Sequence, residues 1–322
     1  MKKKYLSLFG ASLLALTSCG ARGVHHEISD YILELPYTDN FRILQLTDTH
    51  IGDKDDQELH YKFMDLTIEE AHPNLIVVTG DVFTFASKGT ALRFFNWMDS
   101  HNIPWTLTWG NHDEQVYFSI DWVTNVLTNY GHNCKFIDLQ DDDVDGNANF
   151  AINLMNGTNL VHQVIVMDSN RYHYGLDYNG YDYFHQNQID WYSRLVDTTK
   201  TQYGNYKSTM YYHIPLPEVD NAFDEGNIIY GEKNENTCPP KYNSGFFKVI
   251  HDAGSTEGMF FGHDHVNNFR AEYEGILFAY GVKATNRIYY EDVMLGGQVI
   301  VIDNTGNFSV ENPIYHKYSE VL

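Results

Sequence analysis

The sequence has few cysteines and few basic residues, and each shortage excludes a class of protein. Its 322 residues include three cysteines, and no Cys-x-x-Cys pair or Cys/His spacing indicates a structural zinc site. Lysine and arginine total 21 against 43 aspartate and glutamate residues, a formal charge of -22. Because so acidic a surface repels nucleic-acid backbones, we exclude DNA and RNA as partners and disfavour a nuclease. Small phosphate esters are not excluded, since a bound metal ion can dominate the charge inside a cleft.

The composition also lacks the excess of apolar residues that a membrane-spanning protein shows. With 43% hydrophobic and 20% charged residues, it is typical of a globular chain. One apolar run, residues 5–16, follows three lysines at the N-terminus and is too short to span a bilayer comfortably, a pattern typical of a signal peptide. The next residues, Leu16-Thr17-Ser18-Cys19, resemble the bacterial lipobox.

This N-terminal pattern predicts three segments: a signal peptide over 1–18, an acylated Cys19 with a polar tether over 19–38, and a folded domain over 39–322. We therefore expect the protein outside the cytoplasm, anchored by lipid to a bacterial cell membrane. An ordinary signal peptide with an incidental Cys19 is the alternative. In that compartment Cys134 and Cys238 could form a disulfide, and two separate thiols are equally compatible with the sequence.

Apolar runs typical of strands alternate with segments of helical periodicity from residue 41 onward. The first half has expected strands at 41–47, 75–79 and 105–109, with helical patterns around 59–66, 92–98 and 122–127. This alternation favours an α/β fold in which helices cover a parallel sheet. The second half is richer in strands, expected at 150–154, 161–167, 210–214, 259–261, 276–280 and 299–302, with a helix at 188–196. With no internal repeat and no linker, one domain of two sheets is the simplest interpretation.

Two segments leave their roles open. Residues 217–243 are rich in Pro, Gly, Asn and acidic residues, and a loop this long is usually a lid, a binding loop or disordered. Five tyrosines gather between residues 172 and 183, where they could bind a ring-bearing substrate or form a merely aromatic surface loop. These tyrosines are Tyr172, Tyr174, Tyr178, Tyr181 and Tyr183.

Five short polar segments each follow the end of an expected strand. Ligands of open α/β sheets bind beyond the carboxyl ends of the strands, so we expect these segments to meet. Asp48 and His50 are two residues apart, and an extended backbone would point both side chains the same way; His263 and His265 repeat the arrangement. The segments are Asp48-Thr49-His50, Gly80-Asp81, Gly110-Asn111-His112-Asp113, His213 and Gly262-His263-Asp264-His265.

These segments offer carboxylates, imidazoles and an amide oxygen but no thiolate. Such ligands suit divalent or trivalent Mn, Fe or Zn. Two metal ions roughly 4 Å apart can clamp the attacking and leaving oxygens of a phosphoryl displacement and provide a hydroxide nucleophile. A single histidine at a strand end is more often an ordinary hydrogen-bonded residue, but five such segments together favour a two-metal site.

The ordered motifs DTH, GD, GNHD, H and GHDH resemble the calcineurin-like metallophosphoesterase superfamily from about Phe41 to Ile302. The stretches GNHDE, YYHIPLPE, QIDWY and FFGHDHVNNF resemble its small purple-acid-phosphatase-like branch. The resemblance implies a four-layer α/β/β/α sandwich of two mixed sheets. It also implies that His112 faces the leaving group as general acid and does not bind metal. The implied metal ligands are Asp48, His50 and His265 for one ion, Asn111, His213 and His263 for the other, and Asp81 as a bridge.

Two positions depart from known branches of this superfamily. True purple acid phosphatases place a metal-binding tyrosine three residues after the bridging aspartate, where this chain has Thr84. Ser/Thr protein phosphatases have there an aspartate that orients the catalytic histidine, followed by an arginine that grips phosphate, where this chain has Thr84 and Phe85. The resemblance therefore supports neither an iron-tyrosinate nor that phosphate grip. The sequence does not identify the group that orients His112.

Together these residues predict a metallophosphoesterase, either a phosphomonoesterase or a phosphodiesterase, acting on small or lipid-derived phosphate esters. The alternative hypothesis is a non-catalytic metal- or phosphate-binding lipoprotein that kept the fold. His112 argues against that alternative, because a pure binder needs the ligands but no acid on the leaving-group side. The substrate, the metals and the oligomeric state stay open.

Overall fold

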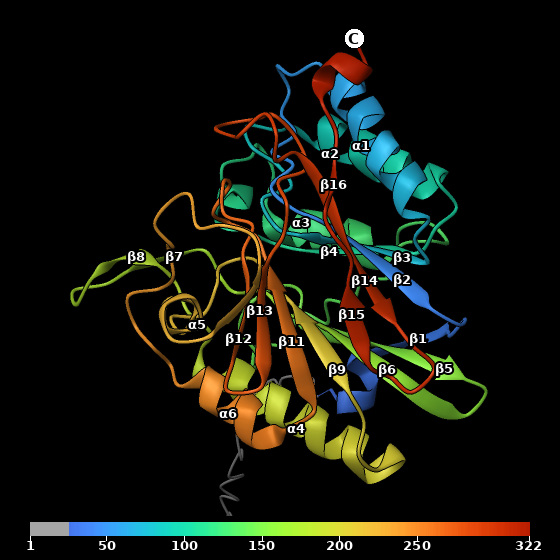
Figure 1. Ribbon diagram of the computed structural model, residues 1–322, viewed down its shortest axis with the longest axis vertical. Helices are drawn as coiled ribbons and strands as arrows, with labels where there is room; N and C mark the ends of the chain where they lie inside the picture. The colour runs from blue at the N-terminus through green and yellow to red at the C-terminus, as the bar shows by residue number, and fades with distance from the viewer. Residues whose placement is uncertain (1–25) are drawn as a thin grey trace, which may run out of the picture.

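Two mixed β-sheets face each other in the computed structural model, which describes residues 26–322 (Figure 1). The larger sheet has eight strands, and its four central ones run parallel to one another. In spatial order these strands are β1 (Ile32–Pro36), β5 (Phe150–Asn156), β6 (Asn159–Val166), β9 (Ser208–Tyr211), β11 (Thr256–Phe261), β13 (Ile276–Tyr280), β12 (Arg270–Tyr273) and β10 (Asn227–Tyr230).

The second sheet has six strands, three of them parallel. In spatial order they are β15 (Phe308–Val310), β14 (Gly296–Ile302), β2 (Phe41–Leu46), β3 (Leu75–Thr79) and β4 (Trp105–Thr108), and β16 (Ile314–Tyr315) pairs with the start of β14. A separate two-stranded hairpin, β7 (Tyr172–Tyr174) and β8 (Asn179–Tyr181), projects from the body of the molecule (Figure 1).

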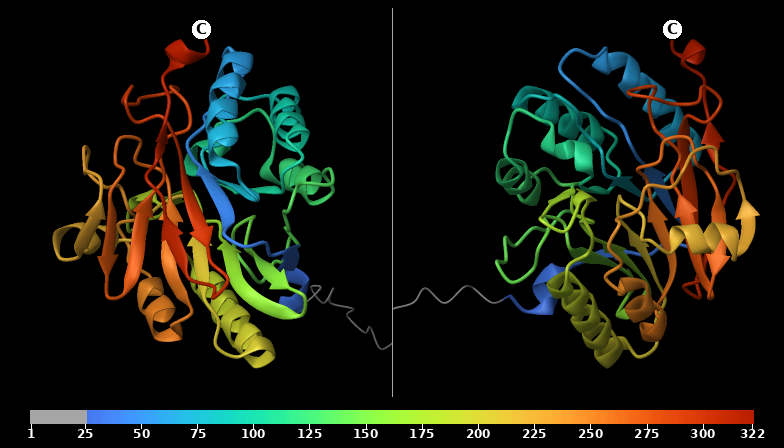
Figure 2. Two further views of the ribbon diagram at one scale, coloured as in Figure 1. Left: turned by 45° about the vertical axis from the view of Figure 1, so that its right-hand side comes forward. Right: turned by 90° about the vertical axis from the view of Figure 1, so that its left-hand side faces the viewer.

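Helices cover the outer face of each sheet, which confirms the predicted four-layer α/β/β/α sandwich (Figure 2). Helices α1 (Gln57–Ala71), α2 (Lys88–Ser100) and α3 (Ile120–Thr128) lie on the smaller sheet, and α4 (Gln186–Tyr203) and α6 (Phe246–Ala253) on the larger. The connections hold α5 (Val219–Asp224) and the 3-10 helices η1 (Ile28–Tyr31), η2 (Asn111–Glu114) and η3 (Tyr318–Glu320). No helix within residues 26–322 is long and apolar enough to cross a membrane.

Local sequence explains the strands and helices that carry the site. All five residues of β3, Leu75–Thr79, are buried, because this strand lies between β2 and β4 and is covered on both faces. The helices α1, α2 and α3 begin at Asp56, Ser87 and Ser119, whose side chains each accept a hydrogen bond from the backbone N–H three residues ahead. These caps fix where each strand-to-helix loop ends.

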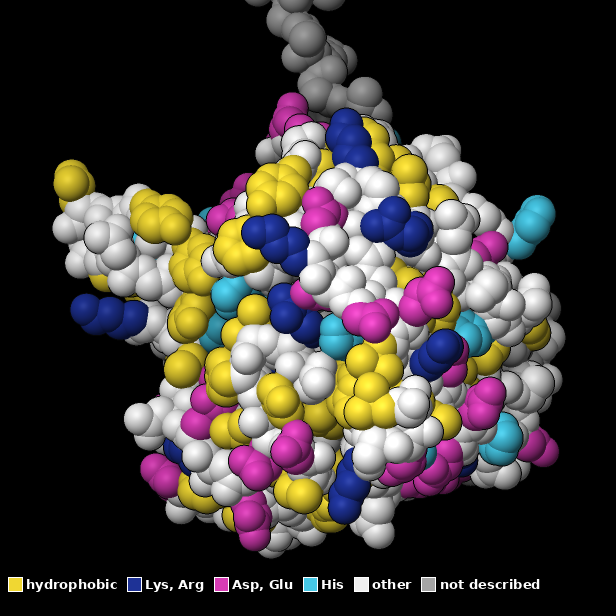
Figure 3. Space-filling view, turned by 90° about the horizontal axis from the view of Figure 1, so that it is seen from above, with side chains coloured by type: hydrophobic (Ala, Val, Ile, Leu, Met, Phe, Trp, Pro, Cys, Tyr) yellow, Lys and Arg dark blue, Asp and Glu magenta, His cyan; other side chains and the backbone are white. Residues whose placement is uncertain are grey.

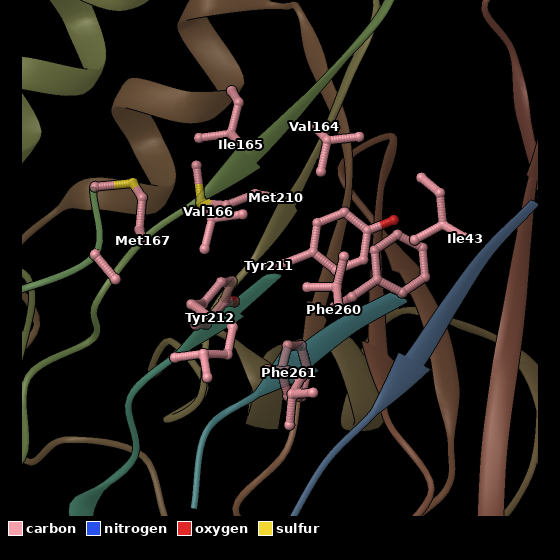
Figure 4. Packing of buried hydrophobic residues seen from close by; sticks show 14 of the residues in the cluster. Ile43, Val164, Ile165, Val166, Met167, Met210, Tyr211, Tyr212, Phe260 and Phe261 are labelled. Atoms are coloured by element: carbon pink, nitrogen blue, oxygen red, sulfur yellow. The ribbon is translucent and has the colours of Figure 1, made fainter. Parts of the chain in front are cut away.

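The main core fills the space between the two sheets (Figure 4). The rings of Tyr211 on β9 and Phe260 on β11 stack with their centroids 5.2 Å apart. Ile43 of β2 lies near them from the opposite sheet, and all three side chains are fully buried. Burying each side chain of this size contributes about 1.5–3 kcal/mol. The packing therefore holds the strand ends of both sheets in a fixed relation.

The folded part begins earlier than predicted. Helix η1 and strand β1 lie within the predicted tether, and β1 pairs in parallel with β5 from Ile32 opposite Ala151. Tyr31 is buried, with its ring 5.7 Å from that of Trp191 on α4. The predicted domain start at residue 39 is therefore wrong, because these apolar residues complete the edge of the larger sheet. The predicted signal peptide and Cys19 lie outside the described residues.

Residues 217–243 are also more ordered than their composition indicated. They contain α5 and the edge strand β10, which pairs antiparallel with β12. The remainder packs on the segment that follows β11: Asn267 Oδ1 accepts hydrogen bonds from the backbone N–H groups of Asn234 and Glu235 at 2.9 and 3.0 Å. This segment thus braces a loop that carries two of the predicted metal ligands. The two described cysteines, Cys134 and Cys238, are free.

Candidate metal centre

The five predicted segments meet at one edge of the sandwich. Strands β2, β3 and β4 are parallel to one another, as are β9 and β11, so their carboxyl ends point to the same place from the two sheets. All seven predicted ligand side chains lie there, each at most 6% exposed. They are Asp48 and His50 after β2, Asp81 after β3, Asn111 after β4, His213 after β9, and His263 and His265 after β11.

Four of these side chains, Asp48, His50, Asp81 and His265, form one buried group. His265 Nε2 lies 3.3 Å from Asp48 Oδ1 and 3.1 Å from His50 Nε2, which in turn lies 3.6 Å from Asp81 Oδ2. One ligand atom from each residue lies within 4.8 Å of those of the other three. Ligands about 2 Å from a common ion are separated by roughly 3–4 Å, so the group has the size of a single metal site.

Asp81 also belongs to a second buried group, with His213 and His263. His213 Nε2 lies 3.3 Å from Asp81 Oδ2, the same oxygen that faces His50. Asn111 is buried beside them and its amide nitrogen donates to Tyr172 Oη at 3.0 Å, which leaves the amide oxygen for a ligand. Two His/Asp groups that share one carboxylate match the arrangement of a two-metal centre.

The residues fit metal ions because their polar atoms are buried and unsatisfied. Within the described residues, five predicted ligand atoms have no hydrogen-bond partner although they are closed off from solvent. Leaving buried polar groups unpaired is costly, and a charged group costs more than a neutral one. A cation at each group would satisfy these atoms. They are Asp48 Oδ1, Asp81 Oδ2, Asn111 Oδ1, His213 Nε2 and His263 Nε2.

Four of the seven residues have a left-handed backbone, which corrects the predicted extended geometry of the Asp48–His50 segment. The φ angles are +54° at Asp48, +48° at His50, +49° at Asp81 and +81° at His263. This region is unfavourable for residues with a side chain, and such strain concentrates at functional sites. The side chains therefore converge as predicted, but they do so through tight turns beyond the strands. The spacing of the motifs does not indicate these turns.

Buried groups from the loop after β13 help to hold this strained backbone. Lys283 Nζ donates to the Asp48 carbonyl oxygen at 2.8 Å, and Thr285 Oγ1 donates to the Thr49 carbonyl oxygen at 2.8 Å. Both side chains are buried, Lys283 to 1% exposure. Sequence reasoning missed them because they lie far from the motifs along the chain and carry no pattern of their own.

Three histidines are oriented by a partner at Nδ1, which directs Nε2 into the centre. His50 Nδ1 lies 2.8 Å from Thr84 Oγ1, His213 Nδ1 lies 2.8 Å from the Thr79 carbonyl oxygen, and His265 Nδ1 lies 2.8 Å from the Tyr289 carbonyl oxygen. A carbonyl partner requires Nδ1 to carry the proton, leaving Nε2 as the ligand atom. Thr84, which stands where purple enzymes have a tyrosine, thus orients a histidine.

The carboxylates of the centre are held in their ionised form. Burial raises the pKa of Asp48, but the interaction with the nearby His265 outweighs it, and the pKa lies well below its usual range. Burial opposes ionisation of Asp81 as well, yet the His213 charge lowers the pKa of that carboxyl. Ionised carboxylates are the form that binds cations.

The histidines of the centre differ in charge. Burial lowers the pKa of His50 well below its usual range and that of His263 to about 3, so both rings are neutral and ready to bind a cation. For His213, burial also lowers the pKa, but the neighbouring Asp81 carboxylate reverses the effect and raises it to about 10. A cation at this position would take over the role of that proton.

His112 lies next to the centre but outside both groups. Its ring centroid is 5.0 Å from that of His50, it is partly exposed, and its backbone N–H donates to Asp81 Oδ1 at 2.7 Å. Its Nδ1 lies 2.9 Å from Gln115 Oε1, which is the orienting group that the sequence did not identify. Gln115 directly follows η2, three residues after His112, and this spacing explains the contact.

Asp113 fixes the loops that carry Asp81 and Asn111. Its carboxylate accepts hydrogen bonds from the N–H groups of Gly110 and Phe83, both at 2.8 Å. Burial, together with the Asp81 charge, raises the pKa of Asp113 to about 7. The last residue of the GNHD motif is therefore a structural clamp between neighbouring loops.

A family model for calcineurin-like phosphoesterases matches residues 41–267, which include every residue of both groups. The chain belongs to the calcineurin-like phosphoesterase family. The family implies a phosphate ester as substrate and, with the two shared groups, a binuclear metal site. The predicted superfamily is confirmed.

Relatives of this phosphoesterase include plant and fungal proteins. It is 30% identical over 277 residues to a probable inactive purple acid phosphatase of Arabidopsis thaliana, covering 75% of this chain and 71% of that one. It is 27% identical over 259 residues to the phosphatase DCR2 of Saccharomyces cerevisiae, covering 71% of this chain and 44% of the yeast protein. A dimetal phosphatase from Danio rerio shares the fold, with 13% identity, 86% of this chain and 100% of that one covered, and a TM-score of 0.52. The chain is thus distantly related to purple-acid-phosphatase-like proteins.

Proposed function

We propose that the protein hydrolyses phosphate esters, as a monoesterase or a diesterase, with two metal ions in the buried centre. The observation that carries the proposal is the set of buried ligand atoms without hydrogen bonds around the shared Asp81. When bound, two such ions supply Lewis-acid activation of water and neutralise the phosphoryl charge, and Mn, Fe or Zn suits these ligands. One ion would be held by Asp48, His50, Asp81 and His265, and the other by Asp81, Asn111, His213 and His263.

In this proposal His112 is the general acid. Gln115 Oε1 accepts from Nδ1 and thereby fixes the ring, so Nε2 is the nitrogen that can donate a proton to the departing oxygen. The ring is partly exposed beside the buried centre, as an acid that meets a substrate must be. Gln115 takes the part that an aspartate plays in Ser/Thr protein phosphatases.

We further propose that the enzyme acts on small or lipid-derived esters outside the cytoplasm, held to a bacterial cell membrane through an acylated Cys19. The support for this location is the N-terminal sequence pattern, in which three lysines, a short apolar run and the LTSC box occur in order. The net charge of -22 supports a small substrate over a nucleic acid.

Reconstitution with metals tests the catalytic proposal. The chelator-stripped protein is loaded separately with Mn, Zn, Fe or Mg, its metal content is measured, and each form is assayed against a panel of phosphate monoesters and diesters. We expect turnover to require close to two ions per chain. Full occupancy with no turnover of any phosphate ester would contradict the proposal.

A non-catalytic binder is the second candidate, favoured by one comparison: the Arabidopsis relative carries the name of a probable inactive phosphatase. The same reconstituted protein distinguishes the two. A binder would retain its metals and bind inorganic phosphate in calorimetry while turning over no ester. The complete ligand set and the oriented His112 favour the enzyme.

A further inference from the structure

A cavity of about 370 Å³ lies beside the metal centre and is not accounted for by metal binding. It opens among the loops that follow β2 and β3, with a contribution from the loop after β13. On the face of the molecule seen from above, hydrophobic, basic, acidic and histidine side chains lie next to one another (Figure 3). The cavity is lined by Gly52, Asp53, Lys54, Asp55, Thr84, Phe85, Tyr117 and Arg287.

Two contacts and one short chain segment join this cavity to the predicted metal ligands and the proposed general acid. Thr84 lines it and holds His50 Nδ1 at 2.8 Å. Arg287 also lines the cavity. Tyr289 follows two residues later in the chain, and its ring stacks on that of His265 with the centroids 4.1 Å apart. The Phe85 N–H donates to the Gln115 carbonyl oxygen at 2.7 Å, and the Gln115 side chain fixes His112. Phe85 and Gln115 therefore connect the cavity to the proposed general acid.

Phe85 and Tyr117 present their rings to solvent instead of to the core. They are 57% and 67% exposed, and neither belongs to the hydrophobic core of the described residues. Phe85 has a φ of +53°, an unfavourable conformation for an aromatic residue. Its backbone is pinned on both sides, by the N–H bond to Gln115 and by the Asp53 N–H bond to its carbonyl oxygen at 3.3 Å. Strain that holds an aromatic ring in solvent indicates a binding role.

Three of the four charged side chains that line the cavity are engaged in the fold, and the fourth, Lys54, is exposed. Arg287 pairs with Asp55 at 2.8 Å, and Asp53 accepts hydrogen bonds from the Ser87 N–H and from the hydroxyl of Thr90. The carboxylates are thus occupied by their own partners. The two exposed rings and the exposed Lys54 are the groups left to make new contacts, and the rings favour an apolar organic group.

We propose that this cavity binds the organic group of the substrate, and that the substrate is the phosphate ester of an apolar alcohol or phenol. The inference rests on the phosphoesterase function proposed above. In the reaction water attacks phosphorus, the ester P–O bond breaks, and the departing oxygen takes a proton from His112 to leave as the free alcohol or phenol. His112 regains a proton from the attacking water, so ester and water give alcohol and phosphate. Phe85, which stands where protein phosphatases have a phosphate-gripping arginine, contacts the organic group instead.

Binding of phosphonates, which cannot be hydrolysed, tests the cavity without relying on turnover. The metal-loaded protein is titrated by calorimetry with methyl-, phenyl- and octylphosphonate. We expect phenyl- or octylphosphonate to bind at least about tenfold more tightly than methylphosphonate, because a ring or chain buried against two aromatic side chains leaves water. Phenyl- and octylphosphonate distinguish an aromatic from an alkyl group in the substrate.

Two variants test whether the preference for phenyl- or octylphosphonate over methylphosphonate arises in the cavity. Phe85→Ala and Tyr117→Ala should each remove most of it while leaving methylphosphonate affinity and metal content unchanged. Leu92→Ala, which truncates a 37% exposed apolar side chain on α2, is the control and should retain it. Equal affinity for all three phosphonates, or equal loss on all three in both cavity variants, overturns the subsite even if esters are turned over. Failure of every phosphonate to bind the metal-loaded protein contradicts the phosphoesterase proposal, and the subsite with it.

Discussion

At the scale of single residues, Asp81 links the two halves of the candidate centre. Its Oδ2 faces both His50 and His213, at 3.6 and 3.3 Å, while its Oδ1 accepts the His112 N–H at 2.7 Å. One carboxylate thus belongs to both candidate metal sites and also holds the backbone of the proposed acid. Its loss should disturb all three functions at once, which separates it from a residue that holds one ion.

Asp81→Asn tests this role. The amide keeps the shape but loses the charge, so we expect the metal content to fall from two ions toward one or none and activity to fall with it. The melting temperature of the protein in excess metal should drop as well, since binding at 100 times Kd stabilises a fold by about 2.7 kcal/mol. Asp168→Asn, which changes a buried carboxylate outside the two groups, is the control and should retain its metals. Normal occupancy and turnover in Asp81→Asn would remove this residue from the centre.

His112→Asn separates an enzyme from a binder. A positioned acid contributes roughly 10²–10⁴ in rate, chiefly where the leaving group is basic. A nitrophenolate leaves without much protonation, whereas an alkoxide does not. The variant should therefore keep its metals, lose little rate on nitrophenyl esters and lose far more on alkyl esters. Equal small losses on both substrates, with metals retained, would show that His112 is not the acid.

At the scale of secondary structure, continuous apolar runs were predictable and irregular connections were not. The strands predicted at 75–79 and 276–280 have those bounds, because strands buried on both faces leave an unbroken hydrophobic signal. The strand β1 was missed because it lies within the segment predicted as a tether, and the helix α6 was missed because its eight residues span only about two turns. Motif order brought the ligand side chains together correctly, but their left-handed backbone and the support from Lys283 depend on tertiary contacts that sequence spacing does not encode.

Strand β6 contains a buried histidine that should make stability depend on pH. His162 Nδ1 lies 2.9 Å from the Gly306 carbonyl oxygen and its Nε2 lies 2.9 Å from Thr209 Oγ1, which ties β6 to β9 and to the turn after β14. Burial lowers the pKa of His162 from 6.5 to about 4. The unfolded chain therefore takes up the proton first, and the contribution is present above about pH 6.5 and lost as the pH falls toward 4.

We expect His162 to account for about 3 kcal/mol of the stability lost over this interval. Urea unfolding at pH 7 and at pH 4.5 measures the difference. In His162→Gln that difference should shrink relative to the wild type, while the exposed His132→Gln should leave it unchanged. An identical pH dependence in His162→Gln and wild type would contradict the assignment.

At the scale of the whole molecule, the charge limits how the protein can be held at a membrane. With 43 acidic against 21 basic residues, the chain has a net negative charge. Anionic lipid headgroups therefore repel it. Helix η1, the first element of the described residues, packs against α4, one of the helices that cover the larger sheet (Figure 2). Attachment to a membrane would therefore depend on acyl chains at Cys19 and not on the surface of the domain.

Cys19→Ser tests that dependence. A serine cannot carry the thioether-linked lipid. Stable anchoring at a bilayer takes more than one acyl chain, or one chain with an added basic patch, so loss of the lipid should release the protein. We expect the variant to leave the membrane fraction or to stall as an unprocessed precursor, whereas Cys134→Ser should fractionate as the wild type does. Because Cys19 precedes the described domain, released Cys19→Ser protein should keep its metals and its turnover of soluble esters. A variant that stays membrane-bound with wild-type processing would show that the lipid anchor is wrong and that some other part of the chain binds the membrane.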